Sequence, residues 1–281
     1  MWLKHPQCSN MSRQVVRKPV SGLVTIGQGR RELAYLLSPG KKTLQIVVKM
    51  SDTPGALAGI LQALSGHINL IGVDAYGSDD GHAILSCFAE PIARVEGLES
   101  LKRLISSSPY ALDCKVTEST DGILVDTFHA GIETQHGESL MLFRRDAMNQ
   151  MFDRMAEIFG SGGEVMLFYE RVSTGESNSN DLLDRMGRDV VGRNMPSVIQ
   201  LLSASGWGEA SIVEVDPAGA PLVRIEDCFE CSSERQSRHG CAFMGGVLTG
   251  SAKAILGTEV RCEETRCRFR GDKHCEFAIT R

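Results

Sequence analysis

The chain has 281 residues, of which 42% are hydrophobic and 23% charged, a composition typical of a globular protein with more than one domain. Its formal charge of −5 argues against a general electrostatic grip on nucleic acid or anionic lipid. The sequence has neither an apolar run of the roughly 18 residues that a membrane span needs nor the apolar stretch of a signal peptide. We therefore expect a cytoplasmic protein that binds neither membranes nor nucleic acid directly.

Cysteine is unevenly distributed along the chain. Three of the nine cysteines are scattered, and the other six lie in the last fifth of the sequence: Cys228, Cys231, Cys241, Cys262, Cys267 and Cys275. In a reducing compartment such a cluster favours metal binding over disulfides.

The first 119 residues divide into an arm and a regular segment. Residues 1–40 contain no long periodic stretch and are predicted to form an N-terminal arm. Within residues 41–119, hydrophobic spacing predicts strands over 44–48, 68–76, 82–88 and 112–116, and helices over 57–64 and 98–105. The order βαββαβ is a split βαβ sandwich of ferredoxin-like type, in the α+β class.

Two short motifs in this segment resemble the ACT domain, a small regulatory module of amino-acid-responsive proteins. Asp52-x-Pro54-Gly55-Ala56-Leu57 precedes the first helix, and His67-Ile68-Asn69-Leu70 leads into the second strand. The resemblance implies a homodimer that binds an amino acid or similar small molecule through Asp52, Pro54, Gly55, Ala56, Leu57 and Asn69. A glycine there lets free N–H groups at a helix start approach a carboxylate. The alternative is that Asp52 only caps the helix and the module only dimerises.

Residues 120–281 are predicted to form a second domain, with 119–122 as the linker. Helices are expected near 148–159, 182–191, 196–202 and 240–256, while 165–171 fits either a strand or a helix. Strands are expected at 212–215, 223–225, 258–267 and 275–279. In the last helix, Gly245, Gly246 and Gly250 imply close backbone packing against another element.

Four residues near the C-terminus form a candidate metal site. A hairpin brings Cys267 close to Cys275, Glu264 lies one turn of side-chain spacing away, and the helix start at Cys241 can supply a fourth ligand. Three thiolates and one carboxylate suit a tetrahedral Zn²⁺ and leave no position for an activated water, so the predicted zinc is structural. The alternative is that these are buried free thiols and a surface glutamate.

Other residues of the same region leave further alternatives open. His239 or His274 could compete as a metal ligand. The additional motif Cys228-x-x-Cys231 fits a redox couple, a second metal half-site, or simply packed thiols.

The residues from about 125 to the end resemble the 4-vinyl reductase domain, a sensory module of phenol-responsive bacterial activators and archaeal proteins, related in fold to the TRAPP vesicle-tethering subunits. The matching residues are Gly206-Trp207-Gly208, Asp227-Cys228-Phe229-Glu230-Cys231, Cys241 with Gly246 and Gly250, Glu264-x-x-Cys267, Gly271-Asp272 and His274-Cys275-x-Phe277. In the phenol sensors zinc binds three cysteines and a glutamate, and Cys241, Glu264, Cys267 and Cys275 fall on those positions. No histidine lies between His136 and His239, so the phenol-anchoring histidine has no counterpart.

A ligand pocket is predicted beside the short helix that precedes the Gly-Trp-Gly motif. One apolar face of this segment carries Met195, Val198, Leu201, Leu202 and Trp207. The indole offers a flat surface and an N–H donor to a ligand. The alternative is that these residues are ordinary core.

The residues thus predict a regulatory protein and not an enzyme. We expect a homodimer in which the ACT-like module senses an amino acid, the 4-vinyl reductase domain holds a small hydrophobic or aromatic compound, and a protein partner carries the output. No catalytic group of telling geometry is visible in the sequence. An adaptor that uses the 4-vinyl reductase fold for complex assembly is the alternative, and a reductase is discounted because no convincing dinucleotide fingerprint occurs.

Overall fold

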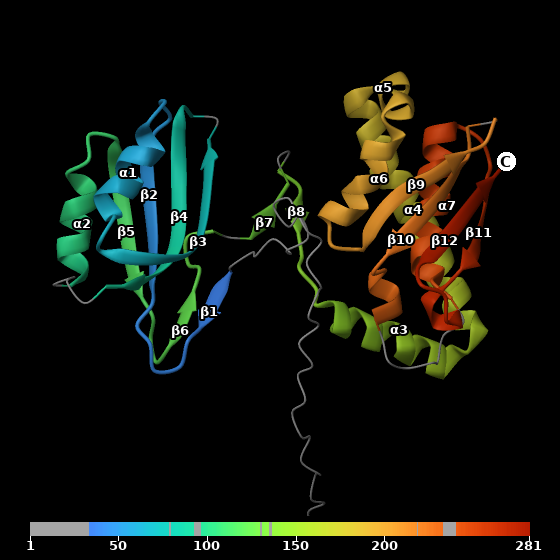
Figure 1. Cartoon of the computed structure of the whole chain (residues 1–281), viewed down its shortest axis with the longest axis horizontal. Coiled ribbons are helices and arrows are strands. Elements are labelled where there is room, and N and C mark those ends of the chain that lie inside the picture. The colour runs from blue at the N-terminus through green and yellow to red at the C-terminus, as the bar shows by residue number, and fades with distance from the viewer. Residues whose placement is uncertain are drawn as a thin grey trace, which may run out of the picture. The chain divides into compact units, whose positions relative to one another are not determined.

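The computed structural model describes residues 34–78, 80–92, 97–129, 131–134, 137–217, 219–232 and 240–281. The chain divides into two compact units, Met1–Gly137 (unit 1) and Glu138–Arg281 (unit 2). Figure 1 shows the elements of both units with their labels.

Unit 1 has the predicted split βαβ topology. Its central elements are β2 (Leu44–Ser51), α1 (Ala56–Leu64), β3 (Ile68–Gly77), β4 (His82–Pro91), α2 (Leu98–Ser106) and β5 (Ala111–Glu118). The four strands pair antiparallel in the order β3-β4-β2-β5, and both helices pack against one face of this sheet (Figure 1). Alternate residues of β2, such as Ile46 and Val48, are fully buried under the helices, so the alternation that predicted the strand also forms the core.

The boundary between the two units lies between Gly137 and Glu138, later in the chain than the predicted start of the second domain at residue 120. β1 (Tyr35–Leu37) pairs with β6 (Ile123–Val125), and β7 (Ile132–Glu133) follows. The N–H of Ser38 donates to the carbonyl of Gly122 at 2.7 Å. Part of the predicted arm and the predicted linker 119–122 therefore belong to unit 1, a correction to the predicted domains. Residues 1–33 of the arm lie outside the described part of the chain.

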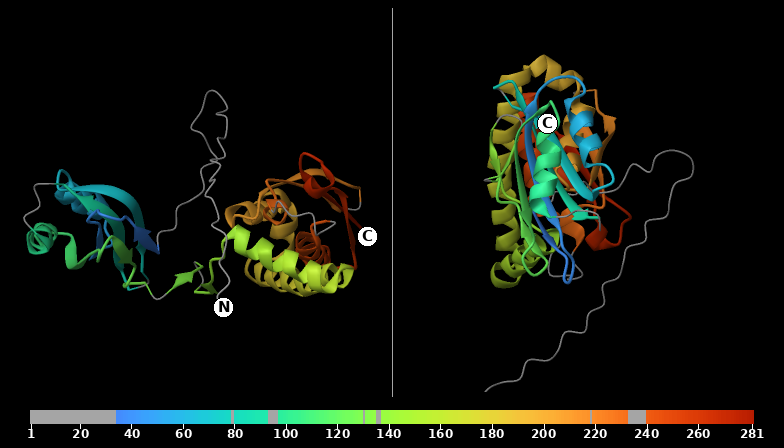
Figure 2. Two further views of the ribbon diagram at one scale, coloured as in Figure 1. Left: turned by 90° about the horizontal axis from the view of Figure 1, so that it is seen from below. Right: turned by 90° about the vertical axis from the view of Figure 1, so that its left-hand side faces the viewer.

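Unit 2 consists of a four-stranded antiparallel sheet and helices. It contains β8 (Ser139–Leu140), α3 (Arg145–Phe159), α4 (Ser161–Met186), α5 (Arg188–Arg193), α6 (Met195–Ala204), β9 (Glu209–Val215), β10 (Pro221–Glu226), α7 (Ala242–Leu256), β11 (Arg261–Arg266) and β12 (Cys275–Thr280), with short 3-10 helices η1 (Phe229–Ser232) and η2 (Arg268–Arg270). The sheet order is β11-β12-β10-β9, and α3, α4 and α7 lie on one side of it (Figure 2). Among the described residues, no helix, including the 26-residue α4, is apolar enough over a sufficient length to cross a bilayer.

Helices α4 and α7 are in backbone contact. A Cβ added to Gly246 would overlap the carbonyl oxygen of Phe168, and one added to Gly250 would overlap that of Val172. The glycines in α7 thus serve the close packing that the sequence predicted, and they place α7 between α4 and the sheet.

Candidate metal centre and ligand cavity

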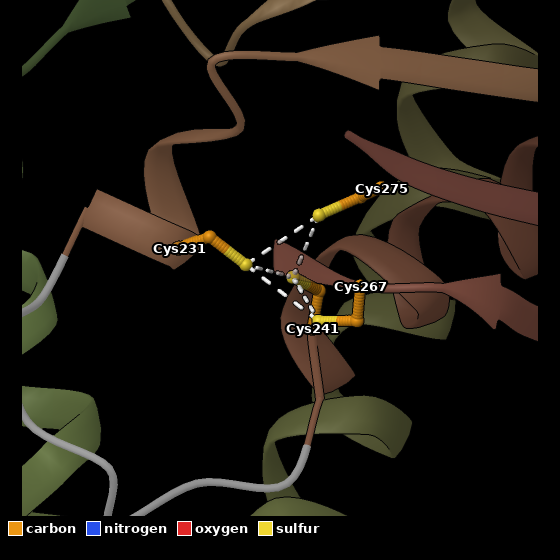
Figure 3. A group of neighbouring side chains, drawn as sticks. All are labelled: Cys231, Cys241, Cys267 and Cys275. Carbon is orange, nitrogen blue, oxygen red and sulfur yellow. Dashed lines mark hydrogen bonds between the residues drawn. The ribbon is translucent and has the colours of Figure 1, made fainter. Parts of the chain in front are cut away.

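Four buried thiols converge at one end of the sheet of unit 2 (Figure 3). Cys231 lies in η1, Cys241 is the N-cap of α7, Cys267 follows β11, and Cys275 begins β12. Their Sγ atoms all lie within 4.8 Å of one another. The Sγ atoms of Cys231 and Cys241 lie 3.0 Å apart, and each lies 3.4–3.9 Å from those of Cys267 and Cys275. A tetrahedral ion with bonds of about 2.3 Å requires S···S edges of about 3.8 Å, so the four thiols fit one such ion.

The loop between β11 and β12 holds two of these cysteines opposite each other. The N–H of Cys267 donates to Oδ2 of Asp272 at 2.8 Å, and the N–H of Asp272 returns a bond to the Cys267 carbonyl at 3.2 Å. Cys275 shares the inward-facing side of β12 with Phe277, and both are fully buried. Strand alternation and a closed loop thus fix both thiols without any metal.

A buried carboxylate joins the other two cysteines. Glu230, the residue before Cys231, is 0% exposed. Its oxygens accept the N–H groups of Phe243 and Met244, at 3.1 and 2.9 Å, in the first turn of α7. Free N–H groups and the helix dipole both favour a carboxylate there. In the sequence, Glu230 stands out only as part of the motif Asp227-Cys228-Phe229-Glu230-Cys231. The signal that could have identified its capping role is its position next to a cysteine and before a helix.

The structure brings together three of the four predicted ligands, Cys241, Cys267 and Cys275. Cys231 completes the group in place of Glu264. The Glu264 carboxylate lies alongside, where Oε2 accepts the N–H of Cys241 at 3.1 Å. Its other oxygen, Oε1, is buried and has no hydrogen-bond partner among the described residues. Burial raises the pKa of the Glu264 carboxyl.

The two histidines considered as competing ligands lie elsewhere. His274 has its Nε2 atom 3.6 Å from the Glu276 carboxylate, and it is not one of the four clustered ligands. His239 lies outside the described residues.

A fifth thiol stands next to the four. Cys228 is fully buried, with its Sγ atom 3.9 Å from that of Cys241. Hydrogen bonding to Cys228 and the other thiols raises the pKa of Cys241 well above its usual value, and the same network lowers the pKa of Cys275. A bound divalent metal takes its cysteine ligands as thiolates, so its binding would displace the thiol protons of the cluster.

Unit 2 also contains a cavity of about 250 Å³. It lies between α4, α6, α7 and the sheet, and all five predicted pocket residues line it: Met195, Val198, Leu201, Leu202 and Trp207. None of the described residues that line it carries an ionisable side chain, and the polar ones are Asn178, Ser179, Ser205 and Ser251 besides the indole. Of the lining residues, Leu201 is 53% exposed, and Asn178 and Ser205 are also exposed.

Trp207 lines the cavity and also packs against Phe229, which lies between Cys228 and Cys231 in the chain. Its ring lies 5.8 Å from that of Phe229 and 5.6 Å from that of Phe243, measured between centroids. Its carbonyl accepts the N–H of Phe229, which lies between Cys228 and Cys231, at 2.9 Å. The Trp207 ring therefore packs against the aromatic residues that flank the thiols.

The predicted ACT-site residues lie around the start of α1 and of β3. Gly55 is the N-cap of α1 with φ of 93°, a left-handed conformation that favours glycine. Among the described residues, no side chain forms a capping hydrogen bond to this helix, so Asp52 does not have the capping role considered for it. Asp52, Pro54, Leu57 and Asn69 are exposed, and Ala56 is buried. Their binding of an amino acid stays a prediction.

Three solved structures are similar to about half of the chain. The phenol-responsive sensory domain of the transcription activator PoxR with phenol is 18% identical, with a TM-score of 0.42, covering 51% of this chain and 77% of that one. A trafficking protein particle complex subunit 3 from Naegleria fowleri, covalently bound to palmitic acid, is 12% identical, with a TM-score of 0.38 and coverages of 48% and 93%. A vinyl-4-reductase family protein from Methanocaldococcus jannaschii is 14% identical, with a TM-score of 0.27 and coverages of 51% and 98%.

Two uncharacterized proteins of Methanocaldococcus jannaschii match in sequence. One is 26% identical over 101 residues, covering 34% of this chain and 58% of the relative, and the other is 28% identical over 67 residues, covering 24% and 37%. The chain thus spans little more than half of the first relative and less of the second. Residues 221–281, which include all four clustered cysteines, match the 4-vinyl reductase domain family. The chain therefore carries a 4-vinyl reductase domain at its C-terminus.

Proposed function

We propose that this protein is a small-molecule-sensing regulator whose 4-vinyl reductase domain binds a small, uncharged, mainly apolar compound. The cavity of about 250 Å³ in unit 2 carries this proposal. An apolar cavity of roughly 150 Å³ is enough to hold benzene, so a substituted ring or a short branched chain suits this one. A charged ligand would lose its hydration without meeting a charged partner in the lining.

The polar lining residues specify the ligand further. Ser251 already donates its hydroxyl to the carbonyl of Gly175 at 3.3 Å. Asn178, Ser179 and the Trp207 indole add a small number of polar groups to an otherwise apolar surface. This is the usual composition of a site that orients a neutral molecule with one hydroxyl or carbonyl group.

We further propose that the four clustered cysteines hold a structural Zn²⁺. Four thiolates and one divalent ion give a formal charge of −2 and fill a tetrahedral coordination shell. The residues that hold the ion are Cys231, Cys241, Cys267 and Cys275, with Glu230 fixing the first two. Zinc bound in this way stabilises the fold and leaves no open position for catalysis, which supports a sensor over an enzyme.

For unit 1 we propose an ACT-like regulatory role, with an amino-acid-type ligand near the start of α1 and pairing of two copies. The split βαβ topology and the left-handed Gly55 before α1 support this proposal. Output then passes to a protein partner.

Fluorescence of Trp207 tests the ligand proposal. Trp2 is replaced by Phe, so that Trp207 is the one remaining tryptophan, and neutral alkylphenols and alkylbenzenes are titrated into the full chain. We expect a saturable change in emission that Ala252→Phe, which fills the cavity, abolishes. The matched control is Ala204→Phe, at an exposed position of α6 that does not line the cavity. An unchanged signal across the panel, or equal binding by both variants, contradicts the proposal.

A further inference from the structure

The metal centre has more donor groups than one tetrahedral ion uses. Besides the four clustered thiols, Cys228 has its Sγ atom 3.9 Å from that of Cys241. The Glu264 carboxylate interacts with the thiols of Cys241 and Cys267, and its Oε1 atom is buried without a partner among the described residues. Two donors beside the four thiols are thus left over, the sulfur of Cys228 and an oxygen of Glu264.

The spare sulfur belongs to Cys228, which is three residues before Cys231, one of the four clustered cysteines. The N–H of Cys231 donates to the carbonyl of Cys228 at 3.1 Å, which closes a turn over these residues. Such a turn keeps the two Cα atoms within about 7 Å, close to the range of about 4.4–6.8 Å that a disulfide spans. Asp227, the residue before Cys228, has a backbone φ angle of 50°, which is uncommon for residues other than glycine.

The spare oxygen is placed to take over the vacated position. Glu264 lies on β11 opposite Phe277 of β12, so its backbone is held by the same hairpin that carries Cys267 and Cys275. Its Oε2 atom is fixed on the N–H of Cys241 at 3.1 Å. An ion held by Cys241, Cys267 and Cys275 would therefore lie beside the Glu264 carboxylate, whose Oε1 atom has no hydrogen-bond partner among the described residues.

We propose that Cys228 and Cys231 form a redox-active dithiol, and that Glu264 replaces Cys231 on the metal when the disulfide forms. With hydrogen peroxide as the oxidant, the two sulfurs lose two electrons, the S–S bond forms, and the bond from Cys231 Sγ to the metal breaks. The O–O bond is reduced to two waters, with one proton from the Cys228 thiol and one from solvent. Glu264 Oε1 then binds the ion, so the four donors keep their formal charge of −4. This inference rests on the metal centre of the proposed function.

Cobalt substitution of the full chain tests the inference, because thiolate-to-Co²⁺ charge-transfer absorption reports the number of bound thiolates. After mild peroxide treatment we expect this absorption to fall by about a quarter, as three of the four thiolates remain bound. One Co²⁺ per chain should stay bound, and peptide mapping should find the Cys228–Cys231 disulfide.

Three variants separate the parts of the inference. Cys228→Ser should keep full absorption and form no disulfide at the same peroxide dose. Glu264→Gln should bind Co²⁺ normally when reduced, which shows that it folds, and lose the ion on oxidation. Cys262→Ser, at a cysteine outside the cluster, should behave as the wild type.

Specific results would overturn the inference. Retention of the ion by oxidised Glu264→Gln, a disulfide between other cysteines, or full absorption after peroxide would each contradict it while leaving the metal centre intact. If the reduced wild-type chain binds no Co²⁺, the proposed metal centre and this inference fail together.

Discussion

The side chains of the four-cysteine cluster are held in place by different means. Cys267 and Cys275 lie on one hairpin, and their spacing of eight residues is local. Cys231 reaches the site through η1, and its alignment depends on Glu230 capping α7. Spacing along the chain does not reveal that contact, and the fourth position was predicted for Glu264 from its place in the hairpin and from the family resemblance.

Loss of one clustered thiol should release the metal. We expect Cys267→Ser to weaken Zn²⁺ binding by more than about 100-fold, beyond what outer-shell changes usually cause, and to lower the stability of unit 2 because metal binding contributes to folding. The measurement is metal stoichiometry with competition by a chelator. Cys262→Ser is the matched control. Equal metal content in the two variants would refute the site.

Unit 1 contains a buried thiol whose ionisation makes stability depend on pH. Burial raises the pKa of Cys87 to about 12, whereas an unfolded cysteine ionises near pH 8.5. Above that pH the unfolded chain binds fewer protons, so the free energy of unfolding of unit 1 should fall, by about 2 kcal/mol between pH 8.5 and 10. Below pH 8.5 the contribution is complete.

Hydrogen exchange of β2 and β4 peptides, corrected for intrinsic rates, measures this pH dependence. Cys87→Ala should remove it, and Cys114→Ala, at a less buried thiol, should retain it. The same slope in all three proteins would show that Cys87 is not its source.

Among the elements, those with clear periodicity were predicted and those without it were not. Every central strand and helix of unit 1 was predicted, and most of them contribute a hydrophobic face to the core, although β3 is mostly exposed beyond Ile68. Helix α4 was not predicted as one element, since residues 173–180 consist largely of Ser, Thr, Gly and Asn, which favour turns in isolation. Packing against α7 overrides that preference. The pair β1–β6 was missed because strands of three residues show no alternation.

The contact between α4 and α7 predicts a contrast between two neighbouring glycines. Gly250→Ala should destabilise unit 2 by about 3 kcal/mol, because its Cβ would overlap the backbone of Val172. Gly245→Ala should change stability by less than about 1 kcal/mol, since its Cβ makes ordinary contacts with the rings of Phe168 at 3.6 Å and Phe277 at 3.9 Å, and alanine favours the helix. Urea unfolding followed by Trp207 fluorescence measures both. A similar loss in both variants would contradict the close packing.

At the scale of the whole molecule, the described residues form two hydrophobic cores that share no buried residue. Removing metal should therefore destabilise unit 2 and leave unit 1 unchanged. Hydrogen exchange with and without a zinc chelator should show faster exchange in α7 and β12 peptides only. Faster exchange in β2 and β4 as well would mean that the two units do not respond independently.

The central claim is that the cavity of unit 2 takes up a small neutral molecule. The most direct measurement is ¹⁹F NMR of the full chain with a library of neutral, apolar fluorinated fragments. We expect line broadening for some fragments with the wild-type chain. This broadening should be lost with Ala252→Phe and kept with Ala204→Phe. Sharp lines for every fragment with the wild-type chain, or broadening that the cavity-filling substitution does not change, would contradict it.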